Sequence, residues 1–376
     1  MISEHADPVA RLGSKETGGQ NVYVYNLAKQ LGALGWEVDV FTRLDSANEQ
    51  RVVRFARRCR VIRVASGPKR YVPRDHLFQY LPDFVDGIVS FKKAHNLSYD
   101  IIHAHYWMSG WSGLKLKKLW EIPLVGTYHS LGYIRYHSLK EHKEQKIDSE
   151  FFRFRIKWEK QLAREADLVI TTSPYEKEDL AKYYDATSAN LVVVPAGINP
   201  ASFHPINQTI ARKHLGLDPV KKVVLYVGRL EWRKGIGTLI AAFAKLAKTT
   251  EKDSAVLIIV GRTDGNEANE VSRLKKLAHD LGIASLVRFV GSKEKKQVRL
   301  FYSAANVCAV PSYYEPFGIV PLEALACGTP VVASSVGGLQ MTSVDGTTGH
   351  LVAPRTPELL AAALKDVLDN ETTYRK

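Results

Sequence analysis

Short runs rich in β-branched residues alternate with amphipathic helical stretches along the entire sequence. This alternation is typical of parallel sheets whose strands are joined by helical crossovers. It occurs in two successive series, and a chain of 376 residues is long enough for two domains. The sequence therefore predicts an α/β protein with two doubly wound domains.

The predicted elements fall on both sides of one turn-rich segment. In the first series we predict strands over 38–42, 60–65, 101–104, 124–128, 168–172 and 191–195, and helices over 21–34, 77–95, 151–165 and 175–184. In the second series we predict strands over 223–227, 256–260, 287–290, 307–310 and 331–333, and helices over 235–247, 269–281, 295–303 and 319–326. Residues 1–7 are interpreted as the tail of an additional strand. Turn formers over 195–205 predict the boundary, which gives domains 1–203 and 204–376.

Composition excludes several classes of protein. The net charge of +13 suggests an anionic partner, but there is no long basic run and no nucleic-acid-binding motif, so nucleic acid is not expected. No stretch of about 18 apolar residues predicts a membrane span, and no charged-then-apolar leader begins the chain. The three cysteines form no metal or disulfide pattern, which fits a reducing cytoplasm.

The segment from Glu315 to Glu323 carries two carboxylates behind the short apolar strand 307–310. Glu315 is expected in a loop, and Gly318 is expected to begin a helix whose first N–H groups can bind an anion. Glu323 lies inside this helix among apolar residues, so it is expected to be half buried and to need a partner. A helix cap and a solvated side chain are the alternative roles for such carboxylates. Carboxylates for hydroxyl groups and N–H groups for phosphate together suit a sugar nucleotide.

A basic turn follows strand 223–227. Arg229 and Lys234 lie on either side of this strand-to-helix connection. Cations next to free helix N–H groups suit a diphosphate, although a solvated basic turn has the same pattern.

Histidines and arginines gather at the predicted strand ends of the first domain. His103, His105 and His129 follow two strands, but their spacing and the lack of a matching carboxylate or cysteine argue against a metal site. Arg155 lies on the helix before strand 168–172, where a solvated arginine is the alternative, and Arg74 follows a basic loop. Several arginines directed at one site favour a phosphorylated ligand.

Together these segments resemble the retaining family-4 glycosyltransferases, which have the GT-B fold of two Rossmann-like domains facing a cleft. The resemblance extends from His5 to about Asp369, and the string from His5 to Tyr23 is similar to sucrose-phosphate synthases and to the inositol-phosphate glycosyltransferases of the mycothiol pathway. It implies an active site in the cleft between the domains. Two departures are residues 133–137, which do not follow the basic stretch of sucrose-phosphate synthases, and the apparent absence of a C-terminal crossing helix.

The resemblance implies roles for individual donor residues. Arg229 and Lys234 would hold the nucleoside diphosphate, and Glu323 would bind the ribose hydroxyls. Glu315, with the backbone of Phe317 and Gly318, would contact the hexose and the phosphate. Two first-domain residues complete this set: Gly19 would contact the donor, and His129 the hexose near its 6-hydroxyl. The catalytic set is then His129, Arg229, Lys234 and Glu315, with no metal or other cofactor.

The resemblance also implies an acceptor site in the first domain. Its residues would be Gly18, Gln20, Arg74, Tyr106, Ser130 and Arg155. The expected activity is transfer of glucose from UDP-glucose to a phosphorylated sugar, with fructose 6-phosphate first and an inositol phosphate as the alternative. A non-catalytic module that binds sugar nucleotides is a further alternative, and a sugar-nucleotide epimerase lacks this pattern of acids. The oligomeric state is not predicted.

Overall fold

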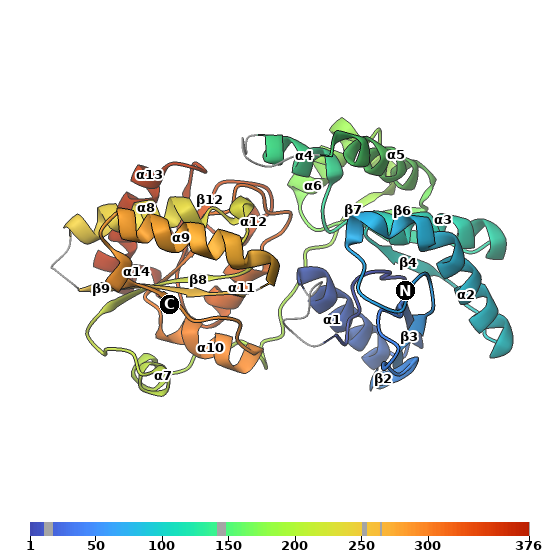
Figure 1. Cartoon of the computed structure of the whole chain (residues 1–376), viewed down its shortest axis with the longest axis horizontal. Helices are drawn as coiled ribbons and strands as arrows, with labels where there is room; N and C mark the ends of the chain where they lie inside the picture. The colour runs from blue at the N-terminus through green and yellow to red at the C-terminus, as the bar shows by residue number, and fades with distance from the viewer. Residues whose placement is uncertain (11–17, 141–147, 250–253, 264, 376) are drawn as a thin grey trace. The chain divides into compact units, whose positions relative to one another are not determined.

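A computed structural model describes residues 1–10, 18–140, 148–249, 254–263 and 265–375. The chain divides into two compact units, Met1–Pro195 and Ala196–Lys376, each built of layered helices and strands (Figure 1). Among the described residues, no helix combines the length and apolar character needed to cross a membrane.

The first unit alternates helices and strands. Its elements are α1 (Gly19–Ala33), β1 (Val38–Arg43), β2 (Val52–Ala56), β3 (Cys59–Val64), η1 (Arg74–His76), η2 (Phe78–Tyr80), α2 (Leu81–Ala94), β4 (Ile102–His105), α3 (Trp107–Trp120), β5 (Leu124–Thr127), α4 (Gly132–Lys140), α5 (Ser149–Glu165), β6 (Leu168–Thr171), α6 (Pro174–Tyr183), η3 (Ser188–Asn190) and β7 (Leu191–Val193).

Parallel pairing organises the sheet of this unit. Strands β4, β5, β6 and β7 are neighbours in that order, β3 lies between β1 and β2, and β2 is antiparallel to β3. Ile2 forms parallel bridges with Phe41 of β1 and Ala104 of β4, so it joins the two groups of strands. The N-terminal segment thus takes the strand position predicted for residues 1–7, and the direction of strand succession reverses beside it.

The side chains of β1 are buried alternately on the two faces of this sheet. Val38 and Val40 pack in the cluster that includes Val24 and Ala28 of α1. Phe41 faces the other way and packs in the cluster with residues of α2, α3, α5 and α6. A strand buried on both faces is expected where helices cover a parallel sheet from both sides.

The second unit repeats the architecture with one parallel sheet. Its elements are α7 (Gln208–Leu215), β8 (Lys222–Val227), η4 (Trp232–Lys234), α8 (Ile236–Thr249), β9 (Ala255–Val260), η5 (Gly265–Glu267), α9 (Ala268–Asp280), η6 (Ala284–Leu286), β10 (Val287–Phe289), α10 (Lys295–Ala304), β11 (Val307–Val310), α11 (Ile319–Ala326), β12 (Val331–Ser334), α12 (Leu339–Thr342), β13 (Gly349–Val352), α13 (Pro357–Asp369) and α14 (Glu371–Tyr374).

The strand order β10-β9-β8-β11-β12-β13 places the first strand of the unit at the centre. This is the order of a doubly wound fold, whose switch point lies between β8 and β11. Helices α8, α9 and α13 pack with Val224 on one face, and α10 and α11 pack with Val223 and Leu225 on the other (Figure 1). The predicted α/β fold with two doubly wound units is confirmed.

Several elements differ from the sequence prediction. The helix predicted over 77–95 begins at Leu81, because residues 74–80 form two 3₁₀ turns before Pro82 enters the first helical turn. The short edge strand β2 and the helices α3, α4, α7 and α13 had no predicted counterpart. Polar and apolar residues are mixed on all sides of helix α3, so its sequence lacks the periodicity that reveals an amphipathic helix.

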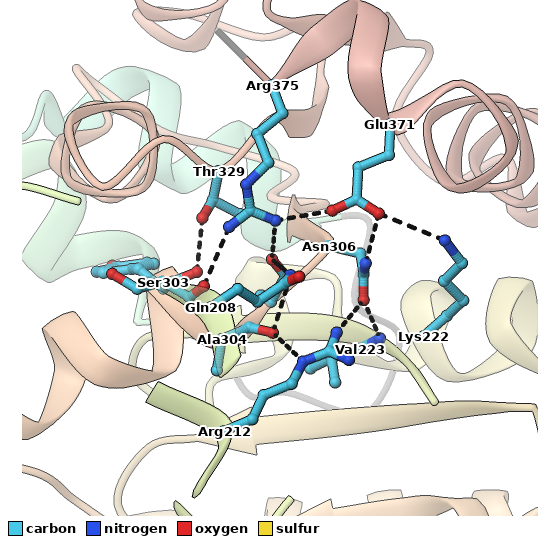
Figure 2. Close-up of polar contacts among 12 residues, drawn as sticks. Gln208, Arg212, Lys222, Val223, Ser303, Ala304, Asn306, Thr329, Glu371 and Arg375 are labelled. Carbon is cyan, nitrogen blue, oxygen red and sulfur yellow. Dashed lines mark hydrogen bonds and ion pairs between the residues drawn. The ribbon is translucent and has the colours of Figure 1, made fainter. Parts of the chain in front are cut away.

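A polar network ties α14 to the second unit (Figure 2). The buried Asn306 amide accepts hydrogen bonds at Oδ1 from Arg212 Nη2 (2.8 Å) and from the backbone N–H of Val223 (2.7 Å), and its Nδ2 donates to Glu371 Oε2 (2.6 Å). Arg375 extends the network by donating from Nη1 to Glu371 (2.7 Å). The Asn306 amide therefore bonds three segments that lie far apart in the sequence, and Lys222 and Arg375 add further contacts to α14.

Replacing Asn306 with leucine is expected to lower the free energy of unfolding by about 3 kcal/mol, because buried donors on Arg212 and Val223 lose their acceptor. Urea denaturation would measure the loss, and hydrogen exchange would show faster exchange over residues 371–375. The control is Asn269→Leu, at an exposed position of α9, which should change stability by less than about 0.5 kcal/mol. Equal stability of the two variants would contradict the importance of this network.

Candidate active site

An ion pair spans the switch point of the second unit. Lys234, in the turn after β8, is paired through Nζ with Glu315 Oε2, in the loop after β11. Ser312 Oγ also donates to Glu315 Oε2 (3.3 Å). Both members of the pair are largely buried, with side chains 17% and 15% exposed. Ligands of doubly wound folds bind at this edge, so the pair lies where a donor nucleotide is expected.

Glycines let the two loops approach each other. Gly235 has a φ of +69°, and a Cβ atom there would lie 1.9 Å from the carbonyl oxygen of Pro311. Gly318 has a φ of +89°, and its Cβ would lie 2.6 Å from Leu339 Cδ2. A side chain at either position would strain the backbone. At Gly235 it would push apart the segments that carry Lys234 and Glu315, and at Gly318 it would push the start of α11 away from Leu339.

Arg229 lies at a more open position than Lys234. Its guanidinium is 41% exposed and pairs with Glu231 Oε1 (2.9 Å) and Glu267 Oε1 (3.4 Å). Tyr226 Oη donates to the Arg229 carbonyl (2.8 Å) and fixes the backbone of the turn. A diphosphate would have to replace these carboxylates as the partner of Arg229.

Helix α11 presents an N-terminus without a side-chain cap. Its N-cap residue is Gly318, which has no side chain to accept from the first N–H groups of the helix. Phe317, just before, is 7% exposed, and its backbone packs against Gly338. The use of these N–H groups for phosphate stays a prediction.

Glu323 is bound to a tyrosine inside the same unit. Tyr302 Oη, fully buried on α10, donates to Glu323 Oε2 (2.9 Å). This hydrogen bond supplies the partner that the sequence required for a half-buried acid. Glu323 Oε1 has no hydrogen bond among the contacts of the described residues, which leaves one carboxylate oxygen for a ligand hydroxyl.

Three histidines meet at the strand ends of the first unit. His105 Nδ1 and His129 Nε2 are 3.0 Å apart, and His103 Nε2 lies 2.8 Å from Thr127 Oγ1. Burial lowers the pKa of His103 and of His129 to about 3. Both rings are therefore neutral at physiological pH, and they offer the donors and acceptors of imidazole rather than a positive charge.

Two arginines converge on Tyr106. The guanidinium carbons of Arg155 and Arg74 lie 4.9 and 5.6 Å from the centroid of its ring. His5 packs on the same ring, with centroids 4.8 Å apart, and burial and the charge of Arg74 lower its pKa. Tyr106 Oη is buried and makes no hydrogen bond within the described part of the chain. The predicted residues Arg74, Tyr106 and Arg155 thus form one cationic cluster with a free hydroxyl.

Arg155 also has a structural partner that the sequence analysis did not anticipate. It is fully buried, and its Nε donates to Glu159 Oε1 (2.7 Å), one helical turn further along α5. Its Nη2 donates to the carbonyl (2.5 Å) and the hydroxyl (3.4 Å) of Ser130. The solvated arginine considered as the alternative is wrong, and Arg155 holds the loop that carries His129 and Ser130.

The start of α1 carries the remaining predicted residues. Gln20 Nε2 donates to Ser3 Oγ (3.2 Å) and to the His105 carbonyl (3.3 Å), which places Gln20 beside the histidines. The N–H of Gly18 donates to Asn21 Oδ1 (3.0 Å), and nothing lies within 4 Å of a Cβ atom built on Gly18. Gly19 begins the helix itself.

The comparisons with known proteins show the family of this chain. Residues 17–202 match the family described as Glycosyltransferase Family 4, and residues 207–376 match Glycosyl transferases group 1. The D-inositol 3-phosphate glycosyltransferase of Corynebacterium aurimucosum is 38% identical over 374 residues, which cover 99% of this chain and 87% of that protein. This chain is a family-4 glycosyltransferase.

Solved structures of similar proteins share the GT-B fold. Sucrose-phosphate synthase from Thermosynechococcus elongatus is 39% identical, with a TM-score of 0.90 over 100% of this glycosyltransferase and 90% of that chain. HepE from Anabaena, solved in complex with UDP-glucose, is 23% identical with a TM-score of 0.75, and covers the same shares of the two chains. The second likeness supports the fold alone.

Sequence reasoning missed partners of the predicted site residues. Tyr23 of α1 packs edge-on against His129, with ring centroids 5.0 Å apart. Glu159 was detectable, because it lies four positions after Arg155 on a predicted helix, where opposite charges pair. Glu267 was not detectable, because it lies 38 positions after Arg229 and reaches it only through the packing of the elements that carry the two residues. Among the described residues of the glycosyltransferase, no group of three or more His, Cys, Asp or Glu could hold a metal ion.

Replacing Glu323 with glutamine is expected to flatten the dependence of stability on pH. Burial raises the pKa of Glu323 from 4.5 to about 7, while the hydrogen bond from Tyr302 acts in the opposite direction. The folded state therefore keeps a proton that the unfolded state loses, and stability falls as pH rises through the window from 4.5 to about 7.

The measurement is the melting temperature at about pH 5 and pH 8, compared between the wild type and Glu323→Gln. The variant should gain stability relative to wild type at the higher pH and change little at the lower. The control is Asp369→Asn, which alters an exposed acid of α13 paired with Lys365. This variant should show the same difference in melting temperature between the two pH values as the wild type. If Glu323→Gln kept the wild-type difference in melting temperature between the two pH values, the raised pKa of Glu323 would be contradicted.

Proposed function

We propose that this glycosyltransferase moves a glucosyl group from UDP-glucose to a hydroxyl of a phosphorylated sugar, with retention at the anomeric carbon. The observation that carries the proposal is the convergence of Arg74 and Arg155 on Tyr106 beside neutral His5. The Arg74 guanidinium, whose side chain is 22% exposed, could bind an anion there, while the charge of buried Arg155 is balanced by Glu159. The acceptor site would also include Gly18, Gln20 and Ser130.

Fructose 6-phosphate is the first candidate acceptor, and an inositol phosphate is the second. The first is supported by the similarity to a sucrose-phosphate synthase at 39% identity and by the segment from His129 to Gly132. The second is supported by the 38% identity to inositol 3-phosphate glycosyltransferases. Both acceptors carry a phosphate, which is the group that the arginine cluster would recognise.

On the donor side, Lys234 and Arg229 would neutralise the diphosphate, and α11 would donate its first N–H groups to it. Glu323 would accept hydrogen bonds from the ribose through its unbonded oxygen. Glu315, released from Lys234 by the incoming phosphate, would accept from hexose hydroxyls. Gly19 and neutral His129 are the further residues proposed to contact the donor.

The proposed reaction takes place on one face of the hexose. The acceptor oxygen forms a bond to the anomeric carbon as the bond to the diphosphate oxygen breaks, and the electron pair leaves with UDP. The proton of the acceptor hydroxyl passes to an oxygen of the departing diphosphate. Positioning and charge stabilisation supply the catalysis, so neither a side-chain nucleophile nor a metal ion is needed.

The test is UDP release from UDP-glucose, measured with fructose 6-phosphate, an inositol phosphate, fructose or no acceptor. The proposal predicts release that depends on a phosphorylated acceptor, and a disaccharide phosphate or glycosylated inositol phosphate as product. Release with fructose equal to that with fructose 6-phosphate would contradict the role of the phosphate. Release with none of the acceptors, together with intact UDP binding by calorimetry, would support a non-catalytic binding module.

A further inference from the structure

Arg43 is a buried arginine directed at backbone rather than at an acid. It is the last residue of β1 and 5% exposed. Its Nη2 donates to the carbonyl oxygens of Arg70 (2.6 Å) and Pro68 (3.1 Å), and its Nη1 also donates to Arg70 (3.3 Å). Among the described ion pairs, none joins Arg43 to a carboxylate. The guanidinium fork therefore has two carbonyls of one loop, separated by Lys69, as its hydrogen-bond partners.

This loop, residues 67–74, is here called the acceptor loop because Arg74 at its end reaches the ring of Tyr106. The base of the loop is fixed by a second contact. Ser66 Oγ donates to the Tyr80 carbonyl (2.6 Å), and Gly67, with a φ of +64°, lies against the Tyr80 ring, where a Cβ atom would come within 2.5 Å.

The acceptor loop contains no helix or strand before η1, and its exposed part includes Lys69 and Arg70, whereas Val72 is half buried against the cluster of Leu77 and Tyr106. Lys69 and Arg70 are both exposed and positively charged, so they repel each other and gain nothing from burial. A loop of this kind has many accessible conformations, and a fixed one requires hydrogen bonds from outside the loop. The contacts of Arg43 supply them from the rigid end of a sheet strand.

We infer that Arg43 is a positioning residue that holds the acceptor loop in the conformation in which Arg74 meets the phosphorylated acceptor. This inference rests on the proposed function. Arg43 acts through the carbonyls of Pro68 and Arg70 and does not itself touch the substrate. Its loss should therefore weaken the acceptor without changing the donor site, whose charged residues Lys234 and Glu315 belong to the second unit.

The first experiment compares Arg43→Gln with the control Arg60→Gln. Arg60, on the adjacent strand β3, forms a two-point ion pair with Asp39 (2.6 and 2.9 Å), and none of its hydrogen bonds within the described residues goes to the acceptor loop. Arg43→Gln should raise the KM for the phosphorylated acceptor about tenfold, since two or more hydrogen bonds to the loop are lost. The affinity for UDP, measured by calorimetry, should stay within about twofold of wild type.

Arg43→Lys adds a test that separates positioning from general stability. Lysine keeps the charge but cannot bridge two carbonyls with a planar fork, so its acceptor KM should lie between those of wild type and Arg43→Gln. Arg43→Gln raising the acceptor KM no more than Arg60→Gln would overturn the inference. Parallel loss of UDP affinity and acceptor affinity in Arg43→Gln would overturn it as well.

The second experiment does not depend on turnover. Trypsin cleaves after Lys69 and Arg70, and the Arg70 carbonyl is the oxygen that Arg43 holds. Under native conditions Arg43→Gln should be cut at this loop several times faster than wild type or Arg60→Gln. Equal cleavage rates would refute the hold on the loop. If Arg43→Gln is cut faster but the enzyme uses no phosphorylated acceptor, Arg43 holds the loop and the proposed function is wrong. The failure of the inference and the failure of the proposed function can therefore be told apart.

Discussion

Lys234→Met is expected to lower kcat/KM by about a thousandfold, because one buried cation that stabilises a leaving group is worth two to three orders of magnitude. Lys234 already pairs with Glu315 across the switch point, so it lies where negative charge would develop on the diphosphate. Methionine keeps the volume of the side chain and removes the charge. The measurement is UDP release at saturating acceptor and varied UDP-glucose.

Lys245→Met is the matched control for this variant. Lys245 lies on α8, the helix that follows the turn of Lys234, and pairs with Glu358 (3.1 Å) at an exposed position. Its activity should remain within about twofold of wild type, as surface ion pairs contribute little. A loss of less than about tenfold in Lys234→Met would show that this lysine does not stabilise the leaving group.

Glu159→Leu is expected to lower the free energy of unfolding by about 4 kcal/mol, because it leaves the charge of Arg155 buried without its partner. The carboxylate also accepts from the N–H of Gly132 (2.9 Å) and from Tyr184 Oη (2.9 Å). Three donors therefore lose their acceptor together. Urea denaturation of the variant and of wild type measures the difference.

The double variant Arg155→Met/Glu159→Leu separates stability from acceptor binding. Removing both charges should recover at least half of the lost stability, since an apolar pair can replace a buried ion pair. Preference for fructose 6-phosphate over fructose should still fall about tenfold or more if Arg155 touches the phosphate. An equal loss of activity with both acceptors would show that Arg155 only holds the loop of Ser130 and does not bind the phosphate.

The elements that carry the predicted donor residues could be predicted from sequence, because their pattern is local. Glu315, Gly318 and Glu323 lie within one strand–loop–helix segment, and the period of the apolar residues places each on its element. The position of Lys234 was predictable for the same reason, as the turn after β8 is short. Their convergence follows from the strand order, which puts β8 beside β11 although 79 positions separate Val307 from Gly228 in the chain.

The arginine cluster could be predicted only in part. The basic character of Arg74 and Arg155 was visible, and the resemblance to a known family suggested their common target. Whether Arg155 is solvated or buried depends on the packing of α5 against the loop of residues 128–132. Because Gly132 has no side chain, the Glu159 carboxylate can lie 2.8 Å from the point that a Cβ atom would occupy. Such close approaches have no signal in local sequence.

The sequence by itself determined the α/β alternation, the two series of strands and the chemical character of the donor loops, because these depend on hydrophobic period and on residues near one another in the chain. Only the tertiary structure decided which charges are paired. It joined Lys234 to Glu315, buried Arg155 against Glu159 and directed Arg43 at the acceptor loop. Partners at these distances are selected by the packing of whole elements, which a local pattern does not encode.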